Sequence, residues 1–174
     1  MKRLLVLLLP LLMFSCAHKQ EEAPEDQGPT AVDRVDALYN SFAEGDVEAV
    51  LAGLADDVEW NEAEGFIYYN GGSYVGKDAV LNGVFGRIGA EWEYWNLVDR
   101  KMSAMGDDGV LVTGRYQAKN NATGKMLDAQ FAHVWKMRDS LVMSFQQYTD
   151  TKQAAEVVMM DEMGDEASED EGNP

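Results

Sequence analysis

Residues 56–65 read DDVEWNEAEG, residues 131–135 read FAHVW and residues 145–151 read FQQYTDT. Val58 and Trp60 in the first stretch and Phe131 and Trp135 in the second are an even number of residues apart, and Phe145 continues the alternation of Leu141 and Met143. Such spacing is typical of a strand with one buried face, because successive side chains point to opposite sides. This alternation places Glu62 on the same face as two apolar residues. It also places His133 between two inward-facing aromatic residues.

Four long strands are expected in the second half of the chain, over about 91–105, 110–119, 126–138 and 141–149. Turns rich in glycine, asparagine and aspartate separate consecutive strands. Strands joined by such short turns pair antiparallel. The second half of the chain is therefore predicted to be an antiparallel meander.

Helices are expected before the meander. Apolar residues recur at helical spacing over 32–42 and again over 47–54, and Asp46 is placed to cap the second of these helices. A third helix is expected from Lys77 to Ile88. Helices followed by a run of antiparallel strands predict an α+β domain.

Together with the GSYVG segment at 72–76, these stretches resemble a SnoaL-like domain of the NTF2-like superfamily, whose cone-shaped α+β fold is shared with ketosteroid isomerase. The resemblance implies a curved antiparallel sheet wrapped around N-terminal helices, with an internal pocket, over residues 30–158. It implies the fold but not the reaction, because one scaffold carries many chemistries.

The faces of the strands also predict which residues line that pocket. Glu62, His133 and Gln147 are in register with apolar residues, and burying such polar groups costs several kcal/mol unless they find partners or water. Polar groups that converge on an apolar face are typical of a ligand cavity. The predicted ligand-binding residues are Trp60, Glu62, Tyr116, Phe131, His133, Trp135 and Gln147.

Each of these residues also has a purely structural interpretation. His133 can be a core histidine with satisfied hydrogen bonds, and Glu62 can lie in water at the rim, where Glu64 is also expected. The aromatic residues can simply form the core. The resemblance favours a pocket role for His133, because SnoaL-like cyclases carry a pocket histidine at the aligned position.

The catalytic bases of the characterised relatives do not carry over to this chain. Ketosteroid isomerases have a base aspartate in the first strand, where this chain has Trp60. SnoaL-like cyclases have one in the last strand, where this chain has Gln147, which cannot take a proton. The oxyanion tyrosine of the isomerases aligns with Leu38, one residue before Tyr39. Neither reaction is therefore assigned.

If the domain is catalytic, Glu62 is the remaining carboxylate on the correct face. Burial beside Trp60 would raise its pKa toward neutrality, as a general base requires. His133 would then orient the substrate or carry the proton. Glu62 and His133 are thus the predicted catalytic pair of the enzyme hypothesis.

The beginning of the chain predicts export. Lys2 and Arg3 precede an apolar run over 4–14 that is too short to cross a bilayer as a stable helix. The following Ser15-Cys16 resembles a bacterial lipobox, so residues 1–15 are expected to be a lipoprotein signal peptide and Cys16 the lipidated residue. The alternative is an ordinary signal peptide with a chance cysteine.

Two polar segments flank the predicted domain. Residues 16–29 contain prolines and charges without an apolar face, which predicts a flexible tether. Residues 159–174 are strongly acidic and are expected to be a disordered tail. We therefore expect a protein of the bacterial cell envelope that contacts the membrane through its lipid anchor only. The outer membrane is the favoured location.

Charge and composition narrow the classes of partner. The formal net charge of −17 argues against a nucleic-acid partner, whose phosphates would repel this surface. The chain has two histidines, and one of them, His18, lies in the tether, so no transition-metal site is expected. No glycine-rich phosphate loop is found, and no cofactor is predicted.

Three hypotheses of function remain open. The first is a module that binds a small, largely apolar molecule in the cone. The second is an enzyme for proton transfer, of isomerase, cyclase or dehydratase type. The third is a homodimer formed through the outer face of the sheet, and it is compatible with either of the others. The apolar residues expected on that outer face are Trp95, Leu97, Leu111, Val134, Val142 and Tyr148.

Overall fold

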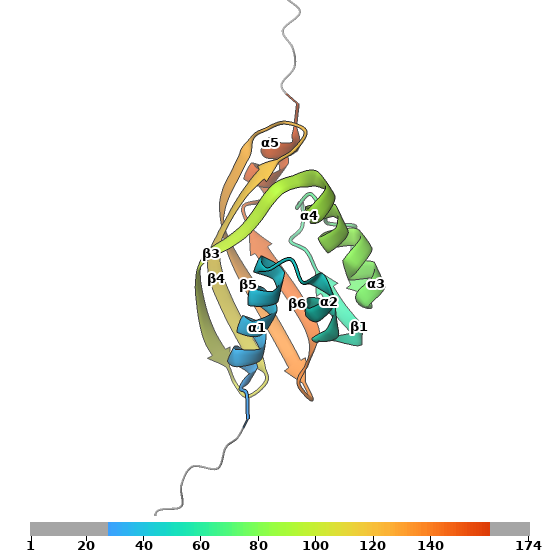
Figure 1. The fold of residues 1–174 in the computed structure, drawn as a ribbon, viewed down its shortest axis with the longest axis vertical. Coiled ribbons are helices and arrows are strands. Elements are labelled where there is room, and N and C mark those ends of the chain that lie inside the picture. The colour runs from blue at the N-terminus through green and yellow to red at the C-terminus, as the bar shows by residue number, and fades with distance from the viewer. Residues whose placement is uncertain (1–27, 161–174) are drawn as a thin grey trace, which may run out of the picture.

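The computed structural model describes residues 28–160, which form an α+β fold with a curved, unclosed sheet (Figure 1). The elements follow in the order α1 (Ala31–Ala43), α2 (Val47–Ala52), β1 (Leu54–Asn61), β2 (Tyr74–Val75), α3 (Lys77–Val80), the π-helical turn η1 (Leu81–Phe85), α4 (Gly86–Glu91), β3 (Trp92–Met105), β4 (Gly109–Asn120), β5 (Met126–Arg138), β6 (Leu141–Thr149) and α5 (Thr151–Val158). The predicted fold class is confirmed.

The six strands lie in the order β2-β1-β6-β5-β4-β3. Strands β3 to β6 pair antiparallel as the predicted meander. The sheet as a whole is mixed, however, because β1 pairs parallel with β6. The third helix and strands β2 to β5 separate these two strands in sequence, so no hairpin fixes their relative direction. Helices α1 to α4 lie to one side of the sheet, and α5 lies near one end of it (Figure 1).

The first two helices begin where the sequence provides caps. Thr30 and Asp33 form a capping box, in which each side chain accepts a hydrogen bond from the backbone N–H of the other. The side chain of Asp46 accepts a hydrogen bond from the backbone N–H of Ala49, 2.9 Å away, so the predicted cap of α2 is confirmed. Helix α1 buries Val35, Leu38 and Tyr39 toward the sheet.

The predicted third helix is longer than expected and contains a π-helical turn. It runs through α3, η1 and α4 to Glu91, and the extra residue in η1 brings both Val84 and Phe85 into the core. Gly83 permits this arrangement, since a Cβ there would lie 2.1 Å from a ring carbon of Tyr74. Helix α5 and the short β2 were not predicted, because each carries too few buried residues to show a period.

The long strands begin and end within one residue of their predicted limits, and those of β5 and β6 match. The first strand differs more. It begins at Leu54, which the helical period had placed at the end of the preceding helix. Gly53 ends α2 instead and leads directly into the sheet.

Three residues expected on the outer face of the sheet lie inside, which corrects the prediction. Trp95 and Leu97 pack against the core, and Val142 is fully buried. The pairing of β3 with β4 shifts register on both sides of this segment, and that of β6 with β5 shifts after Val142. Each shift reverses which side chains face inward, and an unbroken alternation cannot reveal it.

The outer face therefore carries fewer exposed apolar groups than expected. Leu111 and Val134 are half-buried there, and Tyr148 is 57 % exposed. The homodimer stays a prediction. The predicted signal peptide, residues 16–27 of the tether and residues 161–174 of the tail lie outside the described residues. No helix between 28 and 160 is long and apolar enough to span a membrane.

Candidate functional site

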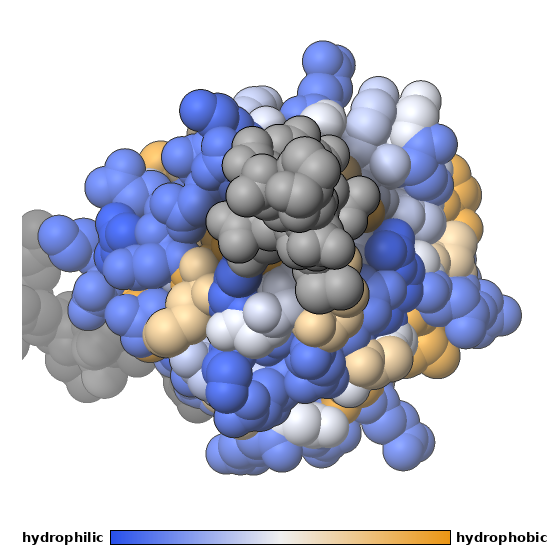
Figure 2. Space-filling model, turned by 90° about the horizontal axis from the view of Figure 1, so that it is seen from above, coloured by the Kyte–Doolittle hydropathy of each residue, from blue (hydrophilic) through white to orange (hydrophobic). Residues whose placement is uncertain are grey.

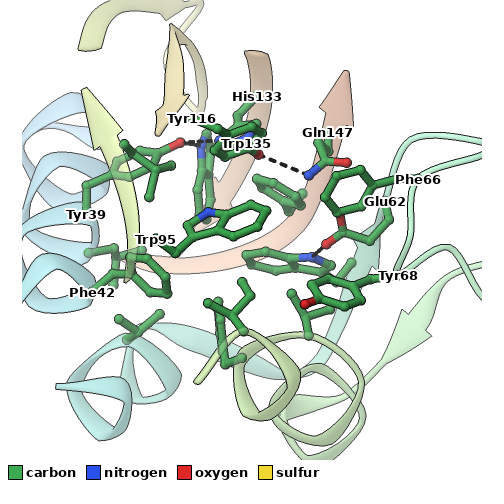
Figure 3. A pocket seen from close by; sticks show the side chains of 18 residues that line it. Tyr39, Phe42, Glu62, Phe66, Tyr68, Trp95, Tyr116, His133, Trp135 and Gln147 are labelled. Atoms are coloured by element: carbon green, nitrogen blue, oxygen red, sulfur yellow. Dashed lines mark hydrogen bonds between the residues drawn. The ribbon is translucent and has the colours of Figure 1, made fainter. Parts of the chain in front are cut away.

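A cavity lies between the curved sheet and the helices (Figure 3). Side chains from α1, α2, η1, α4 and five strands line it, together with the loop that follows β1, and most of them are aromatic or aliphatic. The volume within which the centre of a water molecule can move is about 60 Å³, and one bound water needs only a fraction of that volume. The cavity as it stands suits a compact ligand.

Six of the seven predicted ligand-binding residues line this cavity: Trp60, Glu62, Tyr116, His133, Trp135 and Gln147. The seventh, Phe131, does not line it. Its ring stacks on His133 at 4.2 Å between centroids, with 20° between the planes. Phe131 thus supports the histidine from behind instead of facing the cavity.

His133 stands at the centre of a hydrogen-bond chain (Figure 3). Its Nδ1 lies 2.6 Å from the hydroxyl of Tyr39 and its Nε2 lies 2.5 Å from the hydroxyl of Tyr116. The indole N–H of Trp135 donates to the Tyr39 hydroxyl at 3.0 Å, and the amide of Gln147 donates to the Tyr116 hydroxyl at 3.0 Å. Both ring nitrogens of His133 are therefore occupied by protein groups.

Burial keeps the hydrogen-bonded side chains around His133 uncharged. Desolvation lowers the pKa of His133 to about 3, so the imidazole is neutral near pH 7. Desolvation also raises the pKa of Tyr39 and of Tyr116, and the charge of Glu62 adds to the rise at Tyr116. Both tyrosines therefore remain protonated and can act as hydrogen-bond donors.

Gln147 connects the hydrogen-bond chain around His133 to the loop after β1. Its Oε1 accepts a hydrogen bond from the backbone N–H of Ala63 at 3.2 Å, while its Nε2 donates to Tyr116. The amide is thus held at both ends. Its predicted inward direction agrees with the structure, in which the side chain is buried.

Glu62 is buried in the wall of the cavity and is only 3 % exposed, so it does not lie in water at the rim. Its Oε1 accepts a hydrogen bond from the indole N–H of Trp60 at 2.7 Å. Its Oε2 has no partner, and no other buried side-chain nitrogen or oxygen within residues 28–160 lacks one. Burial raises the pKa of Glu62 to about 7, partly offset by the Trp60 bond. Glu64 is exposed.

Sequence reasoning missed several residues that line the cavity. Tyr39 was passed over because the aligned position is its neighbour Leu38. Trp95 was assigned to the outer face, yet its indole lies across the middle of the cavity (Figure 3). Phe66 and Tyr68 come from the loop after β1, where no periodic pattern exists. The apolar and aromatic run FIYY at 66–69, between small and polar residues, was the signal available for them.

The loop that supplies Phe66 and Tyr68 is anchored to the neighbouring elements. The indole N–H of Trp92 donates to the Tyr68 hydroxyl at 2.7 Å, and that hydroxyl donates to Glu91 at 3.0 Å. Arg87 forms an ion pair with Glu91 at 2.8 Å and lies over the Tyr68 ring.

Within residues 28–160, no three carboxylate, histidine or cysteine side chains gather as a metal site would require.

An α+β domain with a curved, unclosed sheet and a cavity between that sheet and its helices defines the class of this protein. The family model of the SnoaL-like domain matches residues 35–145, and the chain belongs to this family. No curated protein matches the chain.

Solved structures agree with this assignment. An NTF2-like protein from Burkholderia thailandensis is 30% identical, with 76% of this chain and 99% of that chain covered and a TM-score of 0.68. TerC, co-crystallised with polyporic acid, is 26% identical over 73% of this chain and 96% of its own, with a TM-score of 0.64. A candidate polyketide cyclase from Pseudomonas putida, 18% identical over 76% of this chain and 100% of its own, shares the fold at a TM-score of 0.65.

Proposed function

We propose that this SnoaL-like domain binds a small, largely apolar molecule in its cavity. The observation that carries the proposal is the unpaired Oε2 of Glu62 in a wall made mostly of aromatic and aliphatic side chains. A buried carboxylate oxygen without a partner is unfavourable, and it becomes favourable when a bound molecule or water supplies a donor. The TerC structure, co-crystallised with polyporic acid, supports binding of a small molecule by a related chain.

The location proposed for this binding domain rests on the first residues of the chain. We propose that it is exported and held at the cell envelope by a lipid on Cys16, with the residues after Cys16 as tether. A lipid on the N-terminal cysteine anchors a domain without spanning the bilayer. The cavity would then hold its molecule close to a membrane surface.

A second candidate function, proton transfer, is favoured by the pKa of Glu62. A carboxylate whose pKa is raised to about 7 can both take and return a proton near neutral pH. Several solved structures with this fold are called candidate polyketide cyclases, which supports the proposal at the level of the fold. His133 would serve this reaction indirectly, since its two nitrogens already contact Tyr39 and Tyr116.

The binding proposal is tested by filling the cavity. Val84 lines it, whereas Leu111 is a half-buried residue of β4 outside it. Titration with acetophenone, followed by the fluorescence of the tryptophans in the wall, should show saturable binding to the wild type. Val84→Phe should weaken that binding at least about tenfold, as loss of roughly 1.4 kcal/mol would. Leu111→Phe should leave it unchanged. Equal binding by both variants would contradict a site in the cavity.

The variant Glu62→Gln distinguishes the binding function from the proton-transfer function. The readout is exchange of deuterium from D₂O into the methyl group of acetophenone, measured by proton NMR. If Glu62 is a base, the wild type should exchange faster than buffer, and the variant should lose this rate while keeping its affinity within about threefold, because shape is kept and only the base is lost. Equal exchange in both would remove the second candidate and leave the first intact.

A further inference from the structure

The hydrogen-bond chain around His133 contains one hydrogen more than its own bonds use. A neutral imidazole carries one N–H, and Tyr39 and Tyr116 carry one O–H each. The two bonds that join the hydroxyls to Nδ1 and Nε2, one donated by a hydroxyl and one by the ring N–H, use two of these three hydrogens. Trp135 and Gln147 donate to the hydroxyl oxygens through N–H groups, which cannot accept the third hydrogen, and the Oε1 of Gln147 is already bonded to the backbone of Ala63. One hydroxyl hydrogen is therefore left without an acceptor in the chain, and both tyrosines line the cavity.

Two arrangements of these hydrogens are possible, and they differ in which tyrosine holds the free one. If Tyr39 donates to Nδ1, then Nε2–H donates to Tyr116, and the hydrogen of Tyr116 is free. If the chain runs the other way, the hydrogen of Tyr39 is free. Bonds in such a chain polarise one another, so the chain adopts one direction as a unit.

Charged groups near the two ends of the hydrogen-bond chain favour the arrangement in which Tyr39 donates to His133 and His133 donates to Tyr116. The guanidinium of Arg100 lies 5.2 Å from the centroid of the Tyr39 ring, at the first end of the chain. At the other end, Tyr116 feels the charge of Glu62, and Gln147 connects Tyr116 to the backbone of Ala63, the next residue after Glu62. Bond dipoles with their positive ends away from the cation and toward the carboxylate are favourable.

We propose that the free hydrogen of the Tyr116 hydroxyl is donated to an acceptor oxygen of the ligand, and that His133 holds this donor in place as the Nε2–H tautomer without contacting the ligand. The proposal rests on the binding function proposed above. It defines the ligand class more narrowly, as a compact apolar compound with a carbonyl oxygen. Tyr116 is the specificity-determining residue, and His133 is a positioning residue.

The geometry also places that oxygen relative to Glu62. Figure 3 shows Tyr39 on one side of the cavity and Gln147 and Glu62 together on the opposite side, with His133 and Tyr116 between them. The Tyr116 hydroxyl and the unpaired Oε2 of Glu62 therefore line the same cavity. The free hydroxyl hydrogen in an apolar surround favours a carbonyl compound over a hydrocarbon of the same shape, and a bound water can supply the donor for Oε2 that such a compound lacks.

The first experiment determines the tautomer in the unliganded protein. A two-bond proton–nitrogen NMR correlation of uniformly ¹⁵N-labelled protein distinguishes Nε2–H, Nδ1–H and the doubly protonated ring. We expect His133 to show a single Nε2–H pattern at pH 8, where the Glu62 carboxylate that favours this direction is charged. An Nδ1–H pattern would place the free hydrogen on Tyr39, and a doubly protonated ring would free both hydroxyls, so either result would overturn the proposal.

The second experiment compares acetophenone with ethylbenzene, which lacks the carbonyl oxygen. One hydrogen bond to a ligand predicts that the wild type prefers acetophenone about fivefold. Tyr116→Phe keeps the ring and should reduce this preference to about twofold or less, whereas Tyr148→Phe, at an exposed tyrosine outside the cavity, should retain it. In the wild type, the carbonyl stretching band of bound acetophenone should move to lower frequency than in hexane, and it should move back in Tyr116→Phe.

The outcomes separate this proposal from the one on which it rests. If neither compound binds the wild type, the binding function itself fails for this ligand size. If both bind with equal affinity, the cavity binds apolar molecules but the donor role of Tyr116 is wrong. Retention of the preference in Tyr116→Phe, or its loss in Tyr148→Phe, would overturn the assignment. Should Tyr116→Phe fail to fold, the tautomer measured in the wild type still decides.

Discussion

Glu62 illustrates how a single buried group affects both stability and function. Its pKa rises from 4.5 to about 7 in the folded protein because burial disfavours the carboxylate. Between pH 4.5 and pH 7 the unfolded chain loses this proton more readily than the folded one, so the free energy of unfolding falls as the pH rises through this window. Above pH 7 the loss is on the order of 3 kcal/mol.

The first prediction is that Glu62→Gln stabilises the protein only where the carboxylate is charged. At pH 8 the free energy of unfolding should rise by up to about 3 kcal/mol, because the neutral amide avoids the burial of charge. At pH 4.5 the two proteins should differ by less than about 1 kcal/mol, since both side chains are then neutral there. Urea denaturation at the two pH values measures this. An equal loss of stability at both would show that the effect is one of packing.

His133 does not confound this comparison, although its own contribution has the opposite sign. Its pKa is lowered to about 3, so stability is lost as the pH falls below 6.5, where the unfolded chain gains a proton that the buried ring does not accept. Both proteins carry the same histidine, and its contribution is removed when the variant is compared with the wild type at each pH.

At the residue scale, strand parity predicted the inward direction of Glu62, His133 and Gln147, because each falls in register with apolar neighbours in the same strand. Their partners could not be predicted in this way. Tyr39 lies 94 residues from His133 in sequence, and only the packing of α1 on the sheet brings the two side chains together. The unpaired Oε2 of Glu62 is likewise a property of the assembled cavity.

At the element scale, register shifts decide which side chains face the cavity. Near its middle, β3 changes register against β4 between Val98 and Lys101, and Asp99 there has a φ of 54°. On the neighbouring strand, Gly114 lies against this point. A Cβ at Gly114 would lie 2.8 Å from the carbonyl oxygen of Val98 and 2.7 Å from the ring of Phe131. Gly114 thus permits the close approach of Phe131, which stacks on His133.

The second prediction tests that close approach. Gly114→Ala should lower the free energy of unfolding by about 1–3 kcal/mol, because the backbone oxygen of Val98 cannot move away as easily as a side chain end. Gly89→Ala is the matched control: it lies in α4 with open space around it, and it should be neutral or stabilising by up to about 1 kcal/mol. Thermal denaturation of both variants measures the difference. Similar values for the two would show that the sheet relaxes around the methyl group.

The elements themselves were largely predictable, whereas their irregularities were not. Helix caps such as Asp46 and the turns between the long strands depend on a few neighbouring residues and can be recognised in the sequence. The turns set the limits of β5 and β6. A bulge leaves no such local mark. An extra residue in β3 and in β6 exchanged inner and outer faces, which is why Trp95 and Val142 were assigned to the wrong side.

At the scale of the whole molecule, the α+β class followed from the order of helical and strand periods, and the resemblance to SnoaL-like domains added the cone. The parallel pairing of β1 with β6 did not follow, since strands far apart in sequence are free to pair in either direction. The chain's location in the cell rests on the residues before the fold, and it needs its own experiment.

The last prediction concerns Cys16. The basic residues Lys2 and Arg3, the apolar run over 4–14 and the Ser15-Cys16 junction predict that this cysteine is acylated and that the lipid alone holds the protein at the membrane. In a bacterial host fed an alkyne-tagged fatty acid, the wild type should be labelled and should sediment with membranes. Cys16→Ser should lose the label and either leave the membrane fraction or accumulate as an unprocessed precursor. Ser15→Ala keeps a small residue before the cysteine and should behave as the wild type. Labelling and fractionation that do not change in Cys16→Ser would mean that another feature of the chain determines its location.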